Sequence, residues 1–235
     1  MIFTCSFGLS LYIKNKNKKI MMNIERCVCN DIRENCYVVS DSSKECVIVD
    51  CGAYYEAEKQ SLKKYIDDNS LNPTHLIATH GHVDHHLGDR FVFDTWGLKP
   101  EVPEADEALM QQLSEQAAAI MGLRLTQDDF APVGRYLAAN DTISFGDHTF
   151  TIIETPGHSP GSVFFYCEEE AVAFSGDTLF KGSIGRTDFQ GGSMFMIIQS
   201  LRHISQLPDA TKIFPGHGEM TTIGYEETAN PYLDR

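Results

Sequence analysis

The chain has 235 residues, of which 42% are hydrophobic, so it can bury one sizeable core but is short for two full domains. Its formal net charge of −14 excludes a nucleic-acid partner, because non-specific affinity for phosphates depends on an excess of Lys and Arg. An anionic substrate would have to meet local positive charge, supplied by metal ions or by a placed Arg.

The first 22 residues differ from everything that follows. An apolar run over 2–13 precedes four lysines, at positions 14, 16, 18 and 19, with no acidic residue in the segment. This order is wrong for a secretory signal, and the run is too short to span a membrane. We predict a disordered extension or a non-native start over 1–22, and one domain over 23–235. A weak tether to a membrane surface is the alternative; we otherwise expect no membrane partner.

The seven cysteines are odd in number and include no C-x-x-C pair. Most of them fall inside apolar runs, as expected for small buried side chains. Free thiols persist in a reducing compartment, so the sequence predicts a cytoplasmic protein without disulfides.

From residue 23 the pattern alternates between β-favouring runs and turn residues. Leu62, Tyr65 and Ile66 recur at helical spacing after the third run. The first half is therefore predicted to contain strands at 24–28, 37–40, 46–49 and 75–79, and helices at 55–68 and 86–95.

The longest helical pattern covers 101–122, with Pro103 near its start and Gly122 as its stop. A Met- and Ala-rich helix of this kind is typical of a core; the alternative is a substrate lid, with 121–130 lining a mouth. Beyond it the sequence predicts strands at 142–145, 149–153, 162–166, 171–175 and 212–214, and a helix at 194–204. Each half thus holds a β-meander and helices, which favours an α+β fold of two sheets with helices outside.

Directly after the strand at 75–79, four metal-ligand side chains occur within six residues. They are His80, His82, Asp84 and His85. Buried imidazoles and carboxylates are costly unless they are paired or bound to a cation, so such crowding predicts a metal site. The carboxyl end of a strand is where open α/β sheets place their sites.

Three further candidates each lie in a turn just after a predicted strand. His158 and His217 are flanked by Gly and Pro, and Asp177 follows Gly176. Glycine permits the backbone conformations that let a side chain reach inward, and proline stiffens its approach. The same placement at four strand ends predicts that the seven side chains converge.

The pattern His80-x-His82-x-Asp84-His85 with downstream His158, Asp177 and His217 resembles the signature of the metallo-β-lactamase superfamily. The resemblance covers nearly all of 23–235 and implies an αββα sandwich of two mixed sheets. By motif position it also implies two divalent ions, most simply Zn, with Fe or Mn as alternatives. His80, His82 and His158 would hold the first ion, Asp84, His85 and His217 the second, and Asp177 would bridge them.

More closely, the segments 175–189 and 215–223 resemble short hydrolases related to glyoxalase II. This similarity implies hydrolysis of a small-molecule thioester such as an S-acylglutathione, with a hydroxide bridging the metals as nucleophile. Asp84 would orient that nucleophile or handle its proton. Arg186 is the candidate for binding a substrate carboxylate, and an ion pair with Asp188 is its alternative. His75, His86, His148 and His203 match no ligand position, although His86 could support its neighbours.

The sequence departs from glyoxalase II proper at its end. Only 18 residues (218–235) follow His217, so we expect the helical domain that binds glutathione in that family to be missing, and Gly218 and Glu219 stand where the family carries a Tyr. The identity of the thiol therefore stays open. The rival function is an iron-dependent persulfide dioxygenase, which residues 185–189 also resemble. Lactonase or β-lactamase activity and a non-catalytic metal-binding module are lesser alternatives, and the oligomeric state is not predicted.

Overall fold

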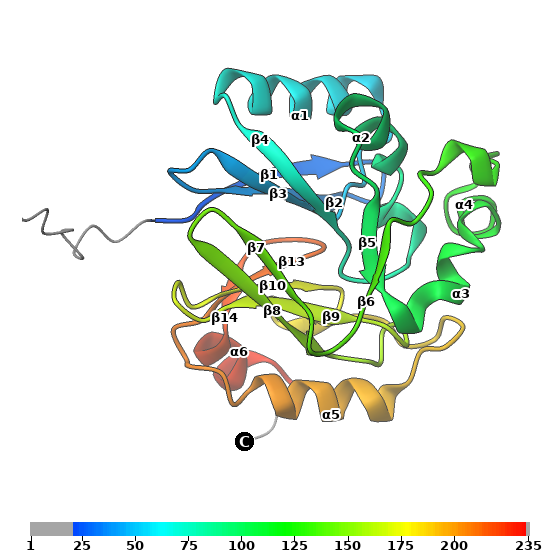
Figure 1. The fold of residues 1–235 in the computed structure, drawn as a ribbon. Helices are drawn as coiled ribbons and strands as arrows, with labels where there is room; N and C mark the ends of the chain where they lie inside the picture. Colours follow the sequence, from blue (N-terminus) through cyan, green and yellow to red (C-terminus); the bar gives the residue numbers. More distant parts are fainter. Residues whose placement is uncertain (1–20, 234–235) are drawn as a thin grey trace, which may run out of the picture.

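The computed structural model describes residues 21–233, and Figure 1 shows two β-sheets stacked face to face with helices on their outer sides. The predicted extension over 1–22 lies outside the described residues, apart from Met21 and Met22. Helices α1 and α2 cover the first sheet, and α5 and α6 cover the second. The predicted αββα sandwich is confirmed.

The first sheet has strand order β1-β2-β3-β4-β5-β6. Its first three strands pair antiparallel and the rest pair parallel, so the sheet is mixed. The strands are β1 (Asn23–Cys29), β2 (Glu34–Ser40), β3 (Glu45–Val49), β4 (Asn72–Ile77), β5 (Pro100–Pro103) and β6 (Arg135–Leu137).

The second sheet has strand order β14-β13-β10-β9-β8-β7, and only its β10–β13 pair is parallel. A small hairpin of β11 (Leu179–Phe180) and β12 (Ser183–Ile184) follows β10. The strands of the second sheet are β7 (Thr142–Phe145), β8 (His148–Glu154), β9 (Val163–Cys167), β10 (Val172–Gly176), β13 (Lys212–Pro215) and β14 (Thr221–Thr222).

Six α-helices and three short 3₁₀ turns complete the described chain. The turns are η1 (Val83–His85), η2 (Glu104–Asp106) and η3 (Gln127–Asp129). The helices are α1 (Glu56–Asp68), α2 (Asp89–Trp96), α3 (Glu107–Met110), α4 (Leu113–Met121), α5 (Met194–Ile204) and α6 (Ile223–Ala229). Within residues 21–233, no helix combines the length and the apolar character needed to cross a bilayer.

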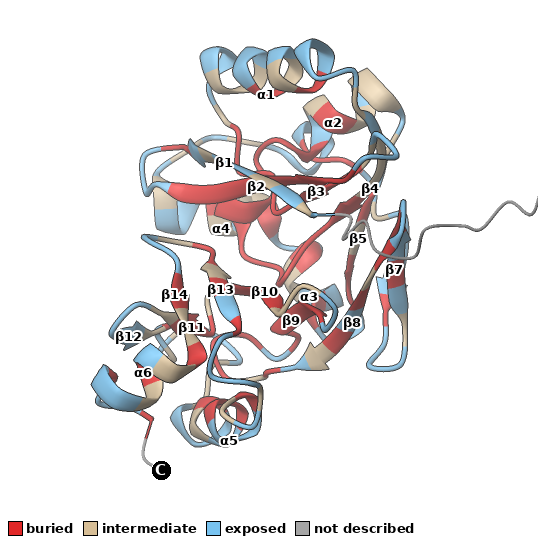
Figure 2. Ribbon diagram, turned by 90° about the vertical axis from the view of Figure 1, so that its left-hand side faces the viewer, coloured by how far each residue is buried: buried red, intermediate tan, exposed pale blue. Residues whose placement is uncertain are grey.

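The core between the sheets follows from the alternation of side chains along each strand. On β3, Val47 and Val49 point into the space between the sheets, while Cys46 and Ile48 point outward, into the cluster that includes Leu62 of α1. Both faces of the strand are covered, which is why its sequence is a continuous apolar run. The second sheet contributes both phenylalanine rings and aliphatic side chains to the inner layer, and Figure 2 shows buried residues concentrated in these strands.

The predicted long helix over 101–122 is wrong. Its first residues form β5, which pairs parallel with β4 and β6, and its remainder is split into η2, α3 and α4. Pro100 and Pro103 suit the edges of a short strand and interrupt regular helix hydrogen bonding. Pairing with two neighbouring strands thus outweighs the helical periodicity of the sequence. The helices predicted at 55–68, 86–95 and 194–204 correspond to α1, α2 and α5.

The six cysteines that the structure describes are free thiols, and five of them are buried. Burial raises the pKa of Cys27 and of Cys46 to about 12, and that of Cys167 to about 11. Thiols with such pKa values are protonated at neutral pH and behave as small apolar side chains.

The two sheets are joined by buried polar contacts next to the end of β13. The Tyr37 hydroxyl, on β2, donates to the carbonyl of Pro215 at 2.7 Å, and the Asn35 amide donates to the same carbonyl at 2.9 Å. The Asn35 backbone N–H donates to the Gly216 carbonyl at 2.7 Å. These bonds fix the position of the turn that carries His217.

We expect Tyr37→Phe to lower the free energy of unfolding by about 1 kcal/mol, because the Pro215 carbonyl loses one of its two buried donors. Urea unfolding measures this change. Tyr225→Phe is the control, since that side chain is 50% exposed, and it should stay within about 0.5 kcal/mol of the parent protein. Equal stabilities of both variants would show that the inter-sheet bond contributes nothing.

Candidate metal centre

The structure brings all seven predicted side chains together where strands of both sheets end. His80 and His82 lie in the loop after β4, and Asp84 and His85 lie in η1. The other three follow strands of the second sheet: His158 comes after β8, Asp177 after β10 and His217 after β13. Residues separated by up to 137 positions (80 to 217) thus reach one place through the strands that carry them.

The donor atoms form overlapping groups that could each hold an ion. The atoms of His80, His82 and His158 all lie within 4.8 Å of one another, as do those of Asp84, His85 and His217. Asp177 lies between these groups. Its Oδ2 is 3.6 Å from both His158 Nε2 and His217 Nε2, and its Oδ1 is 3.6 Å from His85 Nε2. The division matches the two ligand groups expected from the motif, and the role of these residues as ligands stays a prediction.

Several donor atoms of this candidate centre are buried without a hydrogen-bond partner in the described chain. They include His80 Nε2, His85 Nε2 and Asp177 Oδ1. In addition, His82 Nδ1 and His158 Nε2 face each other at 2.8 Å. Buried polar atoms are normally satisfied, so uncompensated atoms aimed at one space indicate that a cation belongs there. The residues present therefore fit a metal site.

Outer contacts orient the imidazoles. His158 Nδ1 donates to the Arg186 carbonyl at 2.8 Å, and His217 Nδ1 donates to the Ile32 carbonyl at 3.1 Å. A carbonyl only accepts, so in both rings Nδ1 carries a proton, and Nε2 is the atom that faces the centre. Metal-binding histidines are usually held in this way.

The electrostatics differ between the two sides of the centre. Burial lowers the pKa of His82 to about 3 and that of His80 well below its usual value, so both rings are neutral. Burial also disfavours a charged His85, but the carboxylates of Asp84, Asp50 and Asp177 outweigh it and raise its pKa to about 10. Concentrated negative charge at this side favours a cation.

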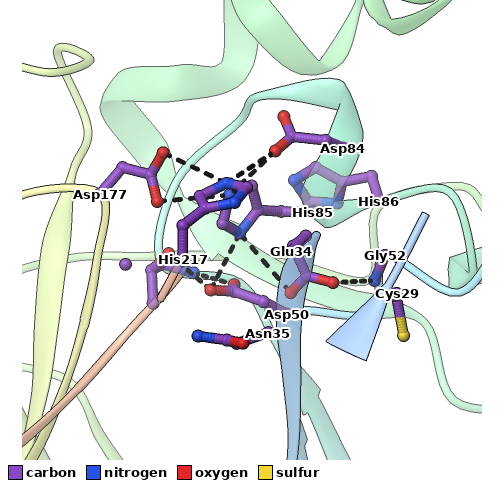
Figure 3. A network of polar contacts seen from close by, with 12 residues as sticks. Cys29, Glu34, Asn35, Asp50, Gly52, Asp84, His85, His86, Asp177 and His217 are labelled. Carbon is purple, nitrogen blue, oxygen red and sulfur yellow. Dashed lines mark hydrogen bonds and ion pairs between the residues drawn. The ribbon is translucent and has the colours of Figure 1, made fainter. Parts of the chain in front are cut away.

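Two buried carboxylates behind His85 were missed by the sequence analysis. His85 Nδ1 lies 3.1 Å from Asp50 Oδ2 and 4.0 Å from Glu34 Oε1, and Figure 3 shows both carboxylates on one side of the ring, opposite Asp84 and Asp177. Asp50 also accepts from the Thr79 backbone N–H at 2.7 Å. The signal for Asp50 was its position directly after β3, at a strand end like the other site residues.

His86 supports the same loop without facing the centre. Its Nε2 donates to the His80 carbonyl at 2.9 Å, and its Nδ1 lies 2.7 Å from Asp89 Oδ2. Burial lowers the pKa of His86, but Asp89 outweighs this effect and raises it above the usual value. His75 lies next to Glu101, and His148 lies 3.0 Å from Asp41, so both have structural partners.

Asp106 links two ligand loops, and the sequence analysis also missed it. One carboxylate oxygen accepts from the Gly81 N–H at 2.8 Å and from the Ser159 hydroxyl at 2.7 Å; the other accepts from the Gly161 N–H at 2.6 Å. The first donor lies between His80 and His82, and the other two follow His158. No local pattern identifies this residue, because its partners lie far from it in the sequence.

Gln116 of α4 fastens this helix to the loop that carries His80 and His82. Its amide nitrogen donates to the Gly81 carbonyl at 3.2 Å and to the Leu109 carbonyl at 2.8 Å. Its amide oxygen accepts from the Val83 N–H at 3.1 Å. Both ends of the side chain are used, so α4 is held rigidly beside the centre.

Arg186 lies in the loop after β12 and is engaged by its neighbours. Its guanidinium makes two hydrogen bonds of 2.7 Å to Asp188, and its Cζ lies 4.0 Å from the centre of the Phe189 ring. The ion pair is the alternative that the sequence left open. The side chain is still 57% exposed, and its binding of a substrate carboxylate stays a prediction.

Glycines make the close approach of the ligand loops feasible. Gly176 has φ of +47°, and a Cβ there would overlap the Thr79 side chain. A Cβ at Gly216 would overlap Asp177 Oδ1. At both positions a larger residue would push the strand ends apart.

Comparisons with known proteins agree with this geometry. A family model described as the Metallo-beta-lactamase superfamily matches residues 30–217. A relative from Haemophilus influenzae named hydroxyacylglutathione hydrolase GloC is 37% identical over 219 residues, which are 91% of this chain and 99% of that protein.

Two solved structures are similar over their whole lengths. The crystal structure of BLEG-1 B3 metallo-beta-lactamase has a TM-score of 0.81 and 33% identity, covering 91% of this chain and all of that chain. The crystal structure of TTHA1623 in a di-iron-bound form has a TM-score of 0.77 and 33% identity, covering 89% of this chain and all of that chain.

We expect Asp106→Asn to lower the free energy of unfolding of the metal-free protein by about 2 kcal/mol. An amide keeps one acceptor, but its NH₂ group then faces buried donors of the ligand loops. Chemical denaturation measures the loss. Asp128→Asn, at an exposed position, should be neutral. If both variants are equally stable, Asp106 does not hold the loops together.

Proposed function

The chain belongs to the metallo-beta-lactamase superfamily, and on that premise we propose that it is a metal-dependent hydrolase of small-molecule thioesters resembling S-acylglutathione. The observation that carries this proposal is the convergence of seven imidazole and carboxylate side chains around one space, in groups that could each hold a metal ion. The relative named for hydroxyacylglutathione hydrolysis, which is matched over nearly its whole length, supports the choice of a thioester.

In this proposal His80, His82 and His158 hold one divalent ion, Asp84, His85 and His217 hold a second, and Asp177 is shared. Imidazole and carboxylate suit Zn, which we favour, and also Fe or Mn. Iron has support from a relative solved in a di-iron-bound form. When bound, such ions supply Lewis acidity that polarises a carbonyl and brings the pKa of a bound water close to neutral.

The chain's own contribution includes the Asp84 carboxylate. Its Oδ2 lies 3.2 Å from His217 Nε2 and 3.4 Å from His85 Nε2, so it faces the centre. Burial raises the pKa of Asp84, but the neighbouring His85 and His217 outweigh burial and lower it below its usual value. A carboxylate that stays ionised accepts a hydrogen bond from water, so we assign Asp84 to orienting the attacking water.

The leaving group explains why no further acid is needed. A small thiol has a pKa of about 8.5, so the departing sulfur leaves as a thiolate without protonation. Free thiols in the described chain suit a reducing compartment, and we propose a cytoplasmic location on this basis.

We expect Asp177→Ala to reduce metal content at both positions and to lower kcat/KM about 100-fold or more, because the shared carboxylate is lost. Elemental analysis of the purified variant gives the metal content, and release of free thiol from S-lactoylglutathione gives the rate. Asp188→Ala, in an exposed loop nearby, should keep its full metal content. Two tightly held ions in the Asp177 variant would contradict the shared role.

We expect Arg186→Ala to raise KM about two- to fivefold for S-acylglutathione, which is the effect expected from the loss of one exposed ion pair. KM for neutral N-acetylcysteamine thioesters should stay unchanged. Asp188→Ala should change KM in the opposite direction, because it frees the guanidinium. Equal effects of Arg186→Ala on acidic and neutral substrates would favour the ion pair with Asp188 over binding of a substrate carboxylate. Oxygen uptake with glutathione persulfide, without thioester hydrolysis, would replace this proposal by the dioxygenase alternative.

A further inference from the structure

A cavity of about 330 Å³ opens beside His82, one of the proposed ligands of the first ion. Its walls come from α3, α4 and the loop after β12. Leu109, Ala119, Ile120 and Phe189 supply its apolar surface. The cavity therefore borders the candidate metal centre at His82 but differs from it in chemistry.

The walls of the cavity are held in place before any substrate binds. Gln116, which also lines it, fixes α4 through hydrogen bonds to three backbone groups. Phe189 is held from two sides: its ring centre is 5.4 Å from that of His82, and the Arg186 guanidinium stacks on it. A preformed apolar surface binds an apolar group without first having to become ordered.

The charges around the cavity disfavour an acyl group that carries a carboxylate. Among the residues of 21–233 that line it, Glu115 is the only acidic one, and none is a Lys or an Arg. The Arg186 guanidinium lies against the Phe189 ring and is engaged by Asp188. A substrate carboxylate placed in the cavity would meet apolar surface and a negative charge.

We propose that this cavity binds the acyl chain of the thioester, so that the preferred substrates carry an apolar acyl group of short to medium length. This inference rests on the proposed thioester hydrolysis. The cavity volume corresponds to roughly ten water-sized groups, at about 30 Å³ each, which accommodates an octanoyl chain. The polar thiol portion of the substrate lies outside the cavity, on the side of the exposed Arg186.

The test measures kcat/KM of the metal-loaded enzyme for acetyl, butanoyl, hexanoyl and octanoyl thioesters of N-acetylcysteamine. Each buried methylene should raise kcat/KM by up to about fourfold until the cavity is full. A flat or falling series would overturn the inference while leaving thioester hydrolysis in place. No turnover of any member, or of S-lactoylglutathione, would overturn the proposed function itself.

Ile120→Glu tests whether the acyl chain binds in this cavity. Ile120 is 36% exposed, so the substitution is compatible with folding. The octanoyl-to-acetyl ratio of kcat/KM should fall about tenfold, as expected from the loss of one to two methylene contacts. Ala118→Glu places the same charge at an exposed position of α4 that does not line the cavity, and it should keep the ratio of the parent enzyme. Equal ratios in both variants would overturn the inference.

Two further measurements separate the acyl chain from the thiol as the occupant. Binding of the non-hydrolysable S-octyl and S-ethyl thioethers of N-acetylcysteamine, followed by calorimetry, should favour the S-octyl compound in the parent protein and not in Ile120→Glu. Glu115→Gln should raise kcat/KM for a glutaryl thioester more than for the butanoyl one. A different outcome is that Ile120→Glu changes the ratio of kcat/KM between glutathione and N-acetylcysteamine thioesters that carry the same acyl group. In that case the cavity holds the thiol and the assignment is wrong.

Discussion

The structure depends on a concentration of buried donor atoms that the protein does not neutralise by itself. His80 and His82 are neutral because burial lowers their pKa values, whereas three carboxylates raise the pKa of His85 to about 10. Several inward-facing atoms have no hydrogen-bond partner in the described chain. Such an arrangement is costly unless a cation compensates it. The same buried side chains therefore determine both the local stability of the fold and the proposed metal chemistry.

The sandwich holds this arrangement by ending strands of both sheets at one edge. Direct backbone bonds tie the ends together: the Val163 N–H donates to the Thr79 carbonyl at 3.0 Å, and the Gly216 N–H donates to the Gly176 carbonyl at 2.8 Å. Asp106 adds a buried carboxylate that serves both the first ligand loop and the loop of His158. The candidate ligands are thus positioned by a rigid scaffold rather than by their own loops.

The same helical segment that supports the metal loop also shapes the proposed acyl cavity. Gln116 bonds to the backbone around His82, while Ala119 and Ile120, on the next turn of α4, face the cavity. A substrate bound there would have its apolar part beside the proposed first ion and its polar part toward solvent. Substrate choice and metal positioning therefore share one structural element.

The sequence by itself determined the seven candidate ligands and most regular elements, because these depend on local spacing, turn residues and short-range periodicity. The family followed from the resemblance of its motif to a known signature. The sequence failed at 101–122, where strand pairing overrides a helical pattern, and it did not identify Asp106, Gln116 or Glu34. Apart from Leu109, which is bonded to Gln116, their partners lie 18 to 55 positions away along the chain, so only the tertiary structure decided their roles. The cavity beside His82 likewise exists only once α4 and Phe189 are brought together, since residues about 70 positions apart form its walls.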